Sequence, residues 1–351
     1  MSDALLPTPF HARTAAQNSA NAWVERSRFS VPAHYGDPEQ EALAARVSAV
    51  VIDISAEQDL RLYGEGAKNL LAAACGPVVA AMPVGRQERV HWCADGGGVR
   101  GFGVLSRVGE EEFLLRAADV DLGWFSAAAP HFGAAITDVT QDRGLLFVGG
   151  PYALPLLAGA RLEAALDAGE FTRTNWRGLA VTLSRSLVSG GYEISCAPED
   201  AWIVFDRLAR AARLVAARLA GENAWQLLQM EAGIPLMHAD FAPAREPFAQ
   251  TPSAAALGLH HSDMPPMVEE PVLTGVVCET DKPLSFARLF LNGMEVGRSL
   301  RSLYSPALQS AIVLAQIQAR HATPGTRLTA RYTDSSGPHE IQARIVPLPF
   351  L

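Results

Sequence analysis

The chain has 351 residues, of which 49% are hydrophobic and 19% charged, and its mean hydropathy is +0.10. This composition is typical of a water-soluble globular protein of two or three domains. The 29 Lys and Arg against 37 Asp and Glu give a net charge of −8, and no basic cluster of the kind that contacts phosphates is present. Nucleic acid is therefore excluded as a partner. No apolar run approaches the ~18 residues of a membrane span, and the N-terminus lacks a signal-peptide pattern, so we expect a cytoplasmic protein with no membrane partner.

The cysteines and histidines do not predict a metal site. The four cysteines have no paired spacing: Cys75, Cys93, Cys196 and Cys278. Zinc ligands usually occur as closely spaced pairs of cysteines or histidines, so we expect reduced core cysteines and no metal. The run His260-His261-Ser262-Asp263 places adjacent histidines on opposite sides of any regular element, which favours a loop. His260 is kept only as a pocket-facing candidate.

Hydrophobic patterning predicts alternating helices and strands in the first part of the chain. We expect helices at 38–46 and 66–74, a helix that begins near Pro151 within 151–167, and a long amphipathic helix over 198–219. The apolar face of the long helix comprises Trp202, Val204, Leu208, Ala211, Leu214, Val215 and Leu219. Strands are expected at 47–54 and 192–196, and a strand pair at 99–107 and 112–116.

The last part of the chain changes character. Residues 241–271 are rich in proline and indicate a linker or a lid. Residues 272–347 alternate short β-rich runs with turns such as Asn292-Gly293, which predicts a small antiparallel barrel. The whole therefore belongs to the α+β class.

Several motifs in order along the chain resemble the T-protein family, the aminomethyltransferase of glycine cleavage and its folate-dependent demethylase relatives. The matching stretches run from Pro-Ala-His-Tyr at 32–35 and Ile-Asp-Ile-Ser at 52–55, through Gly-Gly-Val at 97–99, Arg-Ala-Ala-Asp at 116–119, Leu-Leu-Phe-Val-Gly-Gly-Pro at 145–151 and Met-Glu-Ala-Gly-Ile-Pro-Leu at 230–236, to Gly-Met-Glu-Val-Gly at 293–297, Tyr-Ser-Pro at 304–306, Ile-Val-Leu-Ala at 312–315 and Pro349-Phe350. The resemblance implies a three-lobed assembly around a central cavity. Two mixed α+β lobes would be interleaved over residues 1–268, with a C-terminal antiparallel β-barrel over 269–351.

The departures from the family bear on the chemistry. The family has an Asp-Asp pair beside the folate nitrogen that carries the one-carbon unit, where this chain has Arg100-Gly101-Phe102. The Gly-Tyr-Thr-Gly-Glu loop is shortened to Ser-Leu-Val-Ser-Gly at 186–190, although Arg185 and Tyr192 on either side match. An Arg expected to hold folate aligns with Trp225, and an Asn aligns with Arg116.

These changes suggest a cavity relined for a flatter, more aromatic ligand. Trp225 and Phe102 would stack on such a ligand, while Arg100 or Arg116 would meet a phenolate or carboxylate. The alternative is that Trp225 and Phe102 fill the cavity. Arg185 and Tyr192 complete the expected binding residues. The resemblance also places His34 and Tyr35 at the cavity as candidate proton carriers beside Arg116, and Glu231 in a motif where a structural role competes with binding.

We therefore expect a one-carbon enzyme that removes a hydroxymethyl group as formaldehyde, or a methyl group, from a small aromatic substrate. No cofactor is favoured. The first alternative is a tetrahydrofolate-dependent aminomethyltransferase or methyltransferase, whose folate tail would meet Arg116 and Arg185. The second is a non-catalytic member that binds a ligand or a protein. The partner is in each enzyme case a small molecule, and the sequence is compatible with a homo-oligomer.

Overall fold

The computed structural model describes residues 4–93, 99–163, 165–188, 190–236, 240, 271–284 and 286–351. The chain divides into two units: unit 1 comprises Met1–Val90 and Phe102–Gln226, and unit 2 comprises His91–Gly101 and Leu227–Leu351. Within the described ranges, every helix is too short or too polar to cross a membrane.

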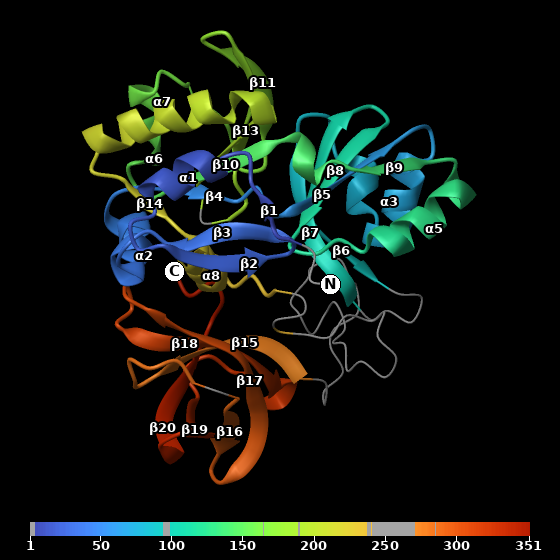
Figure 1. Ribbon diagram of the computed structural model, residues 1–351. Coiled ribbons are helices and arrows are strands. Elements are labelled where there is room, and N and C mark those ends of the chain that lie inside the picture. The colour runs from blue at the N-terminus through green and yellow to red at the C-terminus, as the bar shows by residue number, and fades with distance from the viewer. Residues whose placement is uncertain are drawn as a thin grey trace. The chain divides into compact units, whose positions relative to one another are not determined.

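Unit 1 contains a six-stranded sheet that carries its largest apolar core (Figure 1). Its strands, in spatial order, are β11 (Phe171–Trp176), β12 (Leu179–Arg185), β13 (Tyr192–Cys196), β10 (Gly144–Gly149), β4 (Val50–Asp53) and β14 (Arg218–Ala220). The helices α6 (Ala153–Gly159) and α7 (Ala201–Leu214) pack on one face, where the buried side chains include Leu156 and Leu208. Strand β10 is buried along its whole length because it lies in the middle of the sheet.

A second sheet has five strands. In spatial order these are β6 (Gln87–Cys93), β7 (Val99–Gly109), β8 (Glu112–Ala117), β5 (Gln58–Tyr63) and β9 (Ala135–Asp138). The helices that follow its strands are α3 (Ala67–Cys75), α4 (Val78–Ala81) and α5 (Leu122–Phe132). Strands β7 and β8 form the predicted antiparallel pair, in which Leu105 lies opposite Leu115.

The N-terminal segment forms a small three-stranded sheet of β1 (Leu6–Pro7), β3 (Phe29–His34) and β2 (Ala22–Arg26). The helices nearest to it in the chain are α1 (His11–Gln17) and α2 (Pro38–Val47). The predicted helix at 38–46 is confirmed, and Asp37 caps its N-terminus by accepting hydrogen bonds from the Glu39 and Gln40 backbone. The cap and the proline at the first helical position explain why the helix starts there.

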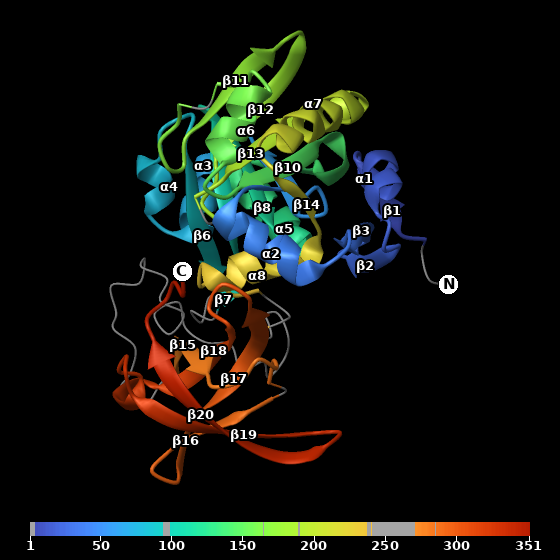
Figure 2. The same ribbon diagram turned by 90° about the vertical axis from the view of Figure 1, so that its left-hand side faces the viewer.

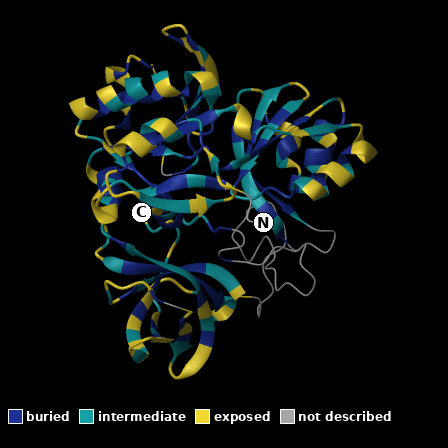
Figure 3. Cartoon of the chain, in the orientation of Figure 1, coloured by how far each residue is buried: buried dark blue, intermediate teal, exposed yellow. Residues whose placement is uncertain are grey.

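The long helix is shorter than predicted. It covers Ala201–Leu214 instead of 198–219, because Ala216 adopts a left-handed backbone (φ 52°) and the chain then enters β14, where Leu219 lies opposite Val51 of β4. The apolar face was also wrong at two positions: Trp202 is 53% exposed and Leu214 is 77% exposed. Figure 3 shows the outer side of this helix as largely exposed.

Unit 2 contains the predicted antiparallel barrel, which is closed (Figures 1 and 2). Its strands, in spatial order, are β15 (Pro271–Cys278), β18 (Ser310–Gln318), β17 (Met294–Ser305), β16 (Arg288–Leu291), β19 (Arg327–Asp334) and β20 (Gly337–Val346). Its interior is filled by apolar side chains such as Val313 and Ile345. Helix α8 (Glu222–Glu231) runs from unit 1 into unit 2. The predicted linker or lid at 241–271 lies outside the described residues, apart from Pro271.

Candidate functional site

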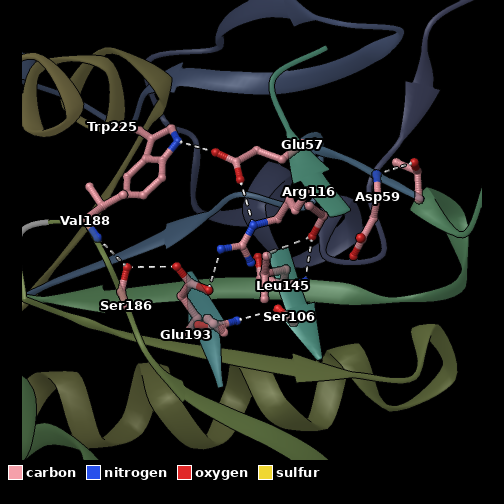
Figure 4. Close-up of polar contacts among 12 residues, drawn as sticks. Glu57, Asp59, Ser106, Arg116, Leu145, Ser186, Val188, Glu193 and Trp225 are labelled. Carbon is pink, nitrogen blue, oxygen red and sulfur yellow. Dashed lines mark hydrogen bonds and ion pairs between the residues drawn. The ribbon is translucent and has the colours of Figure 1, made fainter. Parts of the chain in front are cut away.

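A buried ion-pair network joins the two larger sheets within unit 1 (Figure 4). Arg116 on β8 lies between two carboxylates. Its Nη2 donates a hydrogen bond to Oε2 of Glu193 on β13 at 2.7 Å, and its Nε lies 3.1 Å from Oε2 of Glu57, which precedes β5. The Glu193 side chain is 2% exposed, and the other two are 11% exposed. One cation and two anions are therefore held away from water.

The electrostatic balance keeps Arg116 charged. Burial alone would lower the pKa of its guanidinium, but the carboxylates of Glu193, Glu57 and Asp59 outweigh burial and raise that pKa. Because two of these carboxylates contact Arg116 directly, a carboxylate or phenolate of a ligand would have to compete with them for this cation. The catalytic role of Arg116 stays a prediction, and the structure shows that its guanidinium is paired with Glu57 and Glu193.

The hairpin between β12 and β13 completes the network. Ser186 donates a hydrogen bond from Oγ to Oε1 of Glu193 at 2.8 Å and accepts one from the backbone N–H of Val188 at 3.1 Å. At the base of the same hairpin the guanidinium of Arg185 lies over the ring of Tyr192, 4.5 Å from its centroid. The structure thus brings together Arg185 and Tyr192, and their predicted role in binding stays a prediction.

Trp225 lies in the core of unit 1. Its side chain is 2% exposed, and its Nε1–H donates to Oε1 of Glu57 at 3.1 Å (Figure 4). Its ring centroid lies 4.9 Å from that of Phe147. An indole so placed is already packed and hydrogen-bonded. For Trp225 the structure favours the alternative that the side chain fills space.

A buried carboxylate fixes the segment that carries His34 and Tyr35. Glu41 on α2 accepts hydrogen bonds from the backbone N–H groups of Tyr35 at 2.7 Å, Gly36 at 3.0 Å and Gly221 at 3.0 Å. The backbones approach closely here, since a Cβ on Gly221 would lie 2.4 Å from the carbonyl oxygen of residue 33. Within the described part of the chain, Nδ1 of His34 is buried and has no hydrogen-bond partner.

Tyr35 is held in its protonated form. Burial, followed by the charges of Asp53 and Glu41, raises the pKa of its phenol, while a hydrogen bond with Thr14 acts weakly in the opposite direction. Burial also raises the pKa of Asp53, whose carboxylate accepts from Thr8 Oγ1 at 2.6 Å and from the backbone of Ser55. At neutral pH the Tyr35 phenol is therefore protonated, so it can donate a hydrogen bond but is not a base, and it is a weaker acid than an ordinary tyrosine.

The remaining predicted residues are distributed over both units. Phe102 is half-buried on β7 in unit 1, and Arg100 is half-buried on the same strand in unit 2. Glu231 ends α8 and accepts a hydrogen bond from Oγ of Ser305 at 2.7 Å with 2% exposure, so in unit 2 it connects the helix to β17 of the barrel. His260 lies outside the described residues.

Sequence reasoning missed Glu57 and a second buried pair, in which Nε of Arg143 lies 2.7 Å from Oδ2 of Asp59. Neither carboxylate stands in a motif, and no local pattern distinguishes them from surface acids. In the described part of the chain, no group of three or more His, Cys, Asp and Glu side chains is placed to hold a metal ion.

Comparison with known proteins places this architecture in a family. The profile described as the GCVT N-terminal domain matches residues 10–254, which is more than half of the chain. An aminomethyltransferase of Thermus thermophilus is 29% identical over 348 residues, covering 93% of this chain and 94% of that protein. The aminomethyltransferase of Saccharopolyspora erythraea is 27% identical and covers 98% and 97% of the two chains.

Two further matches extend the comparison. The trimethylamine-oxide aldolase of Ruegeria pomeroyi is 25% identical over 88% of this chain, which corresponds to 42% of that longer protein. Among solved structures, the glycine cleavage system aminomethyltransferase T of Bartonella henselae shares the fold with a TM-score of 0.83 at 20% identity, covering 99% and 98% of the chains. The chain therefore belongs to the GCVT N-terminal domain family, with the α+β fold and C-terminal barrel of the T-protein.

Proposed function

We propose that this protein is a formaldehyde-releasing one-carbon lyase that acts on a hydroxymethyl group of a small aromatic substrate and does not use folate. The observation that carries the proposal is the engagement of Glu57 with both Arg116 and Trp225. At the positions of Arg116 and Trp225 the family resemblance implies polar groups that contact folate. In this chain the charge of Arg116 is balanced by Glu57, and the Trp225 indole is buried and hydrogen-bonded to the same carboxylate. Similarity to a trimethylamine-oxide aldolase supports lyase chemistry within the family.

The proposed step balances without an external oxidant or reductant. A base takes the proton of the hydroxymethyl oxygen, and the O–H electron pair forms the carbonyl of formaldehyde. The bond between the one-carbon group and the substrate breaks, its electron pair stays with the aromatic fragment, and that fragment takes up a proton. Positive charge near the departing fragment would lower the barrier, and we assign this role to Arg100, because the charge of Arg116 is already matched by Glu57 and Glu193.

His34 and Tyr35 have complementary properties for the two proton transfers. The buried Nδ1 of His34 has no hydrogen-bond partner within the described residues, and we assign His34 the base role. The Tyr35 hydroxyl is protonated at neutral pH, and even with its raised pKa it is a stronger acid than the aromatic fragment that must be protonated, so we assign it the donor role. Arg100, Phe102, Arg185 and Tyr192 remain the proposed binding residues.

The alternative is a tetrahydrofolate-dependent transferase, which the similarity to two aminomethyltransferases over nearly the whole chain favours. The described residues fit folate poorly. Arg116 is occupied by two carboxylates, so one of the two cations expected to meet the folate tail already has partners. We therefore derive no step through folate.

Turnover with and without tetrahydrofolate distinguishes these functions. The purified chain is incubated with a panel of hydroxymethyl-substituted aromatic compounds, and formaldehyde is measured together with the aromatic product. We expect equal amounts of the two, unaffected by added tetrahydrofolate. Product formation that requires tetrahydrofolate would establish the transferase, and folate binding without any turnover would establish the non-catalytic member.

Substitutions at two histidines, one in the proposed site and one in the barrel, provide a test and its matched control. Loss of a general base lowers turnover by about 100-fold or more, and we expect this for His34→Gln. His321→Gln, at a half-buried position on the 3₁₀ turn Ala319–His321 of the barrel, should leave turnover unchanged. Equal activity of the two variants would remove His34 from the mechanism.

A further inference from the structure

A groove of 540 Å³ lies on the six-stranded sheet of unit 1. Arg173, Thr182 and Ser195 stand opposite one another on β11, β12 and β13 and line it. Residues on either side of this row, such as Val181 and Ile194, belong to the core beneath α6 and α7. Because side chains alternate along a strand, the row projects from the other face of the sheet. This volume suits a small organic molecule.

The wall of the groove contains a guanidinium with unused donors. Nε of Arg143 is paired with Asp59, whereas Nη1 and Nη2 are buried and, within the described residues, have no hydrogen-bond partner. The two terminal nitrogens form the edge of a guanidinium that binds carboxylate or phosphate oxygens in parallel. Buried donors of this kind normally have a partner.

The other polar groups of the lining are also mostly donors. Arg173 is exposed and, among the described residues, forms no ion pair, so it can lie over a bound anion. The amide of Asn175 and the hydroxyls of Thr182 and Ser195 are additional donors, and Ala180 adds an apolar surface. Asp142 is the single carboxylate of the lining and opposes a negative ligand.

We propose that this groove binds a small organic anion, with a carboxylate or phosphate group between Arg143 and Arg173 and an apolar body along the sheet. The lining does not include Arg116, whose cation is already matched by two carboxylates, although Asp59, the partner of Arg143, also acts on Arg116. It adds a second small-molecule site to unit 1, one that does not depend on the proposed lyase activity.

Calorimetric titration of the full chain tests the proposal. Benzoate and phenyl phosphate are the anionic probes, and their relative affinities identify the preferred group; benzamide is the neutral control. We expect saturable binding of at least one anion and weaker binding of benzamide. Absence of saturable anion binding at millimolar concentration, or equal affinity for benzamide, would overturn the proposal.

Charge variants test where the anion sits. Arg173→Gln should weaken binding about tenfold, the loss typical of one charge-assisted hydrogen bond. Asp142→Asn should tighten it, because a negative charge is removed from the lining. Both residues line an open part of the groove, so neither change endangers folding. Arg177→Gln, an exposed residue of the same β11–β12 hairpin outside the groove, should change nothing. Failure of either groove variant to move the affinity in the stated direction refutes the site.

Discussion

Replacing Arg116 by methionine should destabilise unit 1 far more than removing an exposed arginine of the same sheet. The substitution keeps most of the side-chain volume but leaves Glu57 and Glu193 buried without their cation. Removing one partner of a buried ion pair costs about 3–5 kcal/mol, because the remaining charge is uncompensated. In a unit of this size, such a loss lowers the melting temperature by roughly 6–20 °C.

The loss of stability in Arg116→Met should also depend on pH, and the direction of that dependence can be stated. Buried carboxylates without a cation favour the protonated form, so the folded variant binds protons more readily than the unfolded chain does. Stability of the variant relative to the natural chain should therefore recover as the pH falls from about 7 toward 5 and worsen as it rises.

Arg61→Met is the matched control, because Arg61 pairs with Glu112 at 2.8 Å across β5 and β8 but its side chain is 47% exposed. Exposed pairs contribute about 0–1 kcal/mol. Thermal and urea unfolding of both variants at several pH values provide the measurement. An Arg116→Met variant that unfolds like Arg61→Met at pH 7, with no pH dependence, would refute the described charge network.

Three further predictions follow from buried groups. Glu41→Gln should cost about 2 kcal/mol in the free energy of unfolding, because an amide replaces a charged acceptor of three backbone hydrogen bonds; an unchanged urea midpoint would contradict this. Tyr35 should remain protonated past the ordinary tyrosine pKa of about 10. The stability that its buried phenol contributes is therefore complete below that pH and lost as the pH rises through the elevated pKa of the folded state. The assay is an ultraviolet titration of the natural chain and of Tyr35→Phe, and a difference between the two curves that shows ionisation near pH 10 would be inconsistent with burial of Tyr35. Burial, followed by the nearby charge of Asp200, raises the pKa of Cys196 to about 12, so this thiol should resist alkylation at pH 8 in the folded chain and react on unfolding; mass spectrometry of labelled peptides would detect the opposite.

Local patterns of the sequence predicted the elements that local physics determines. The apolar run of β4, the helical composition of α2 and the β7–β8 hairpin were recognisable because each depends on residues close in the chain. The barrel was recognisable from turns such as Asn292-Gly293. The end of α7 could not be recognised from the sequence, because it depends on the pairing of β14 with β4, a contact between segments more than 160 residues apart.

The candidate site was predictable only in part for the same reason. Arg116 and Trp225 stood out as departures from a family pattern, but their partner Glu57 is 168 residues from Trp225 and stands in no motif. The sequence showed which side chain replaced a family residue, not where that side chain points. The orientation of the indole toward Phe147 and Glu57 is set by the packing of the core.

The most direct test of the central claim is a calorimetric titration of the purified chain with reduced tetrahydrofolate. If one-carbon chemistry in this protein proceeds without folate, no binding heat should be detected at millimolar tetrahydrofolate. Micromolar or tighter binding would contradict the account and identify the protein as a folate-dependent member of its family or a folate-binding one.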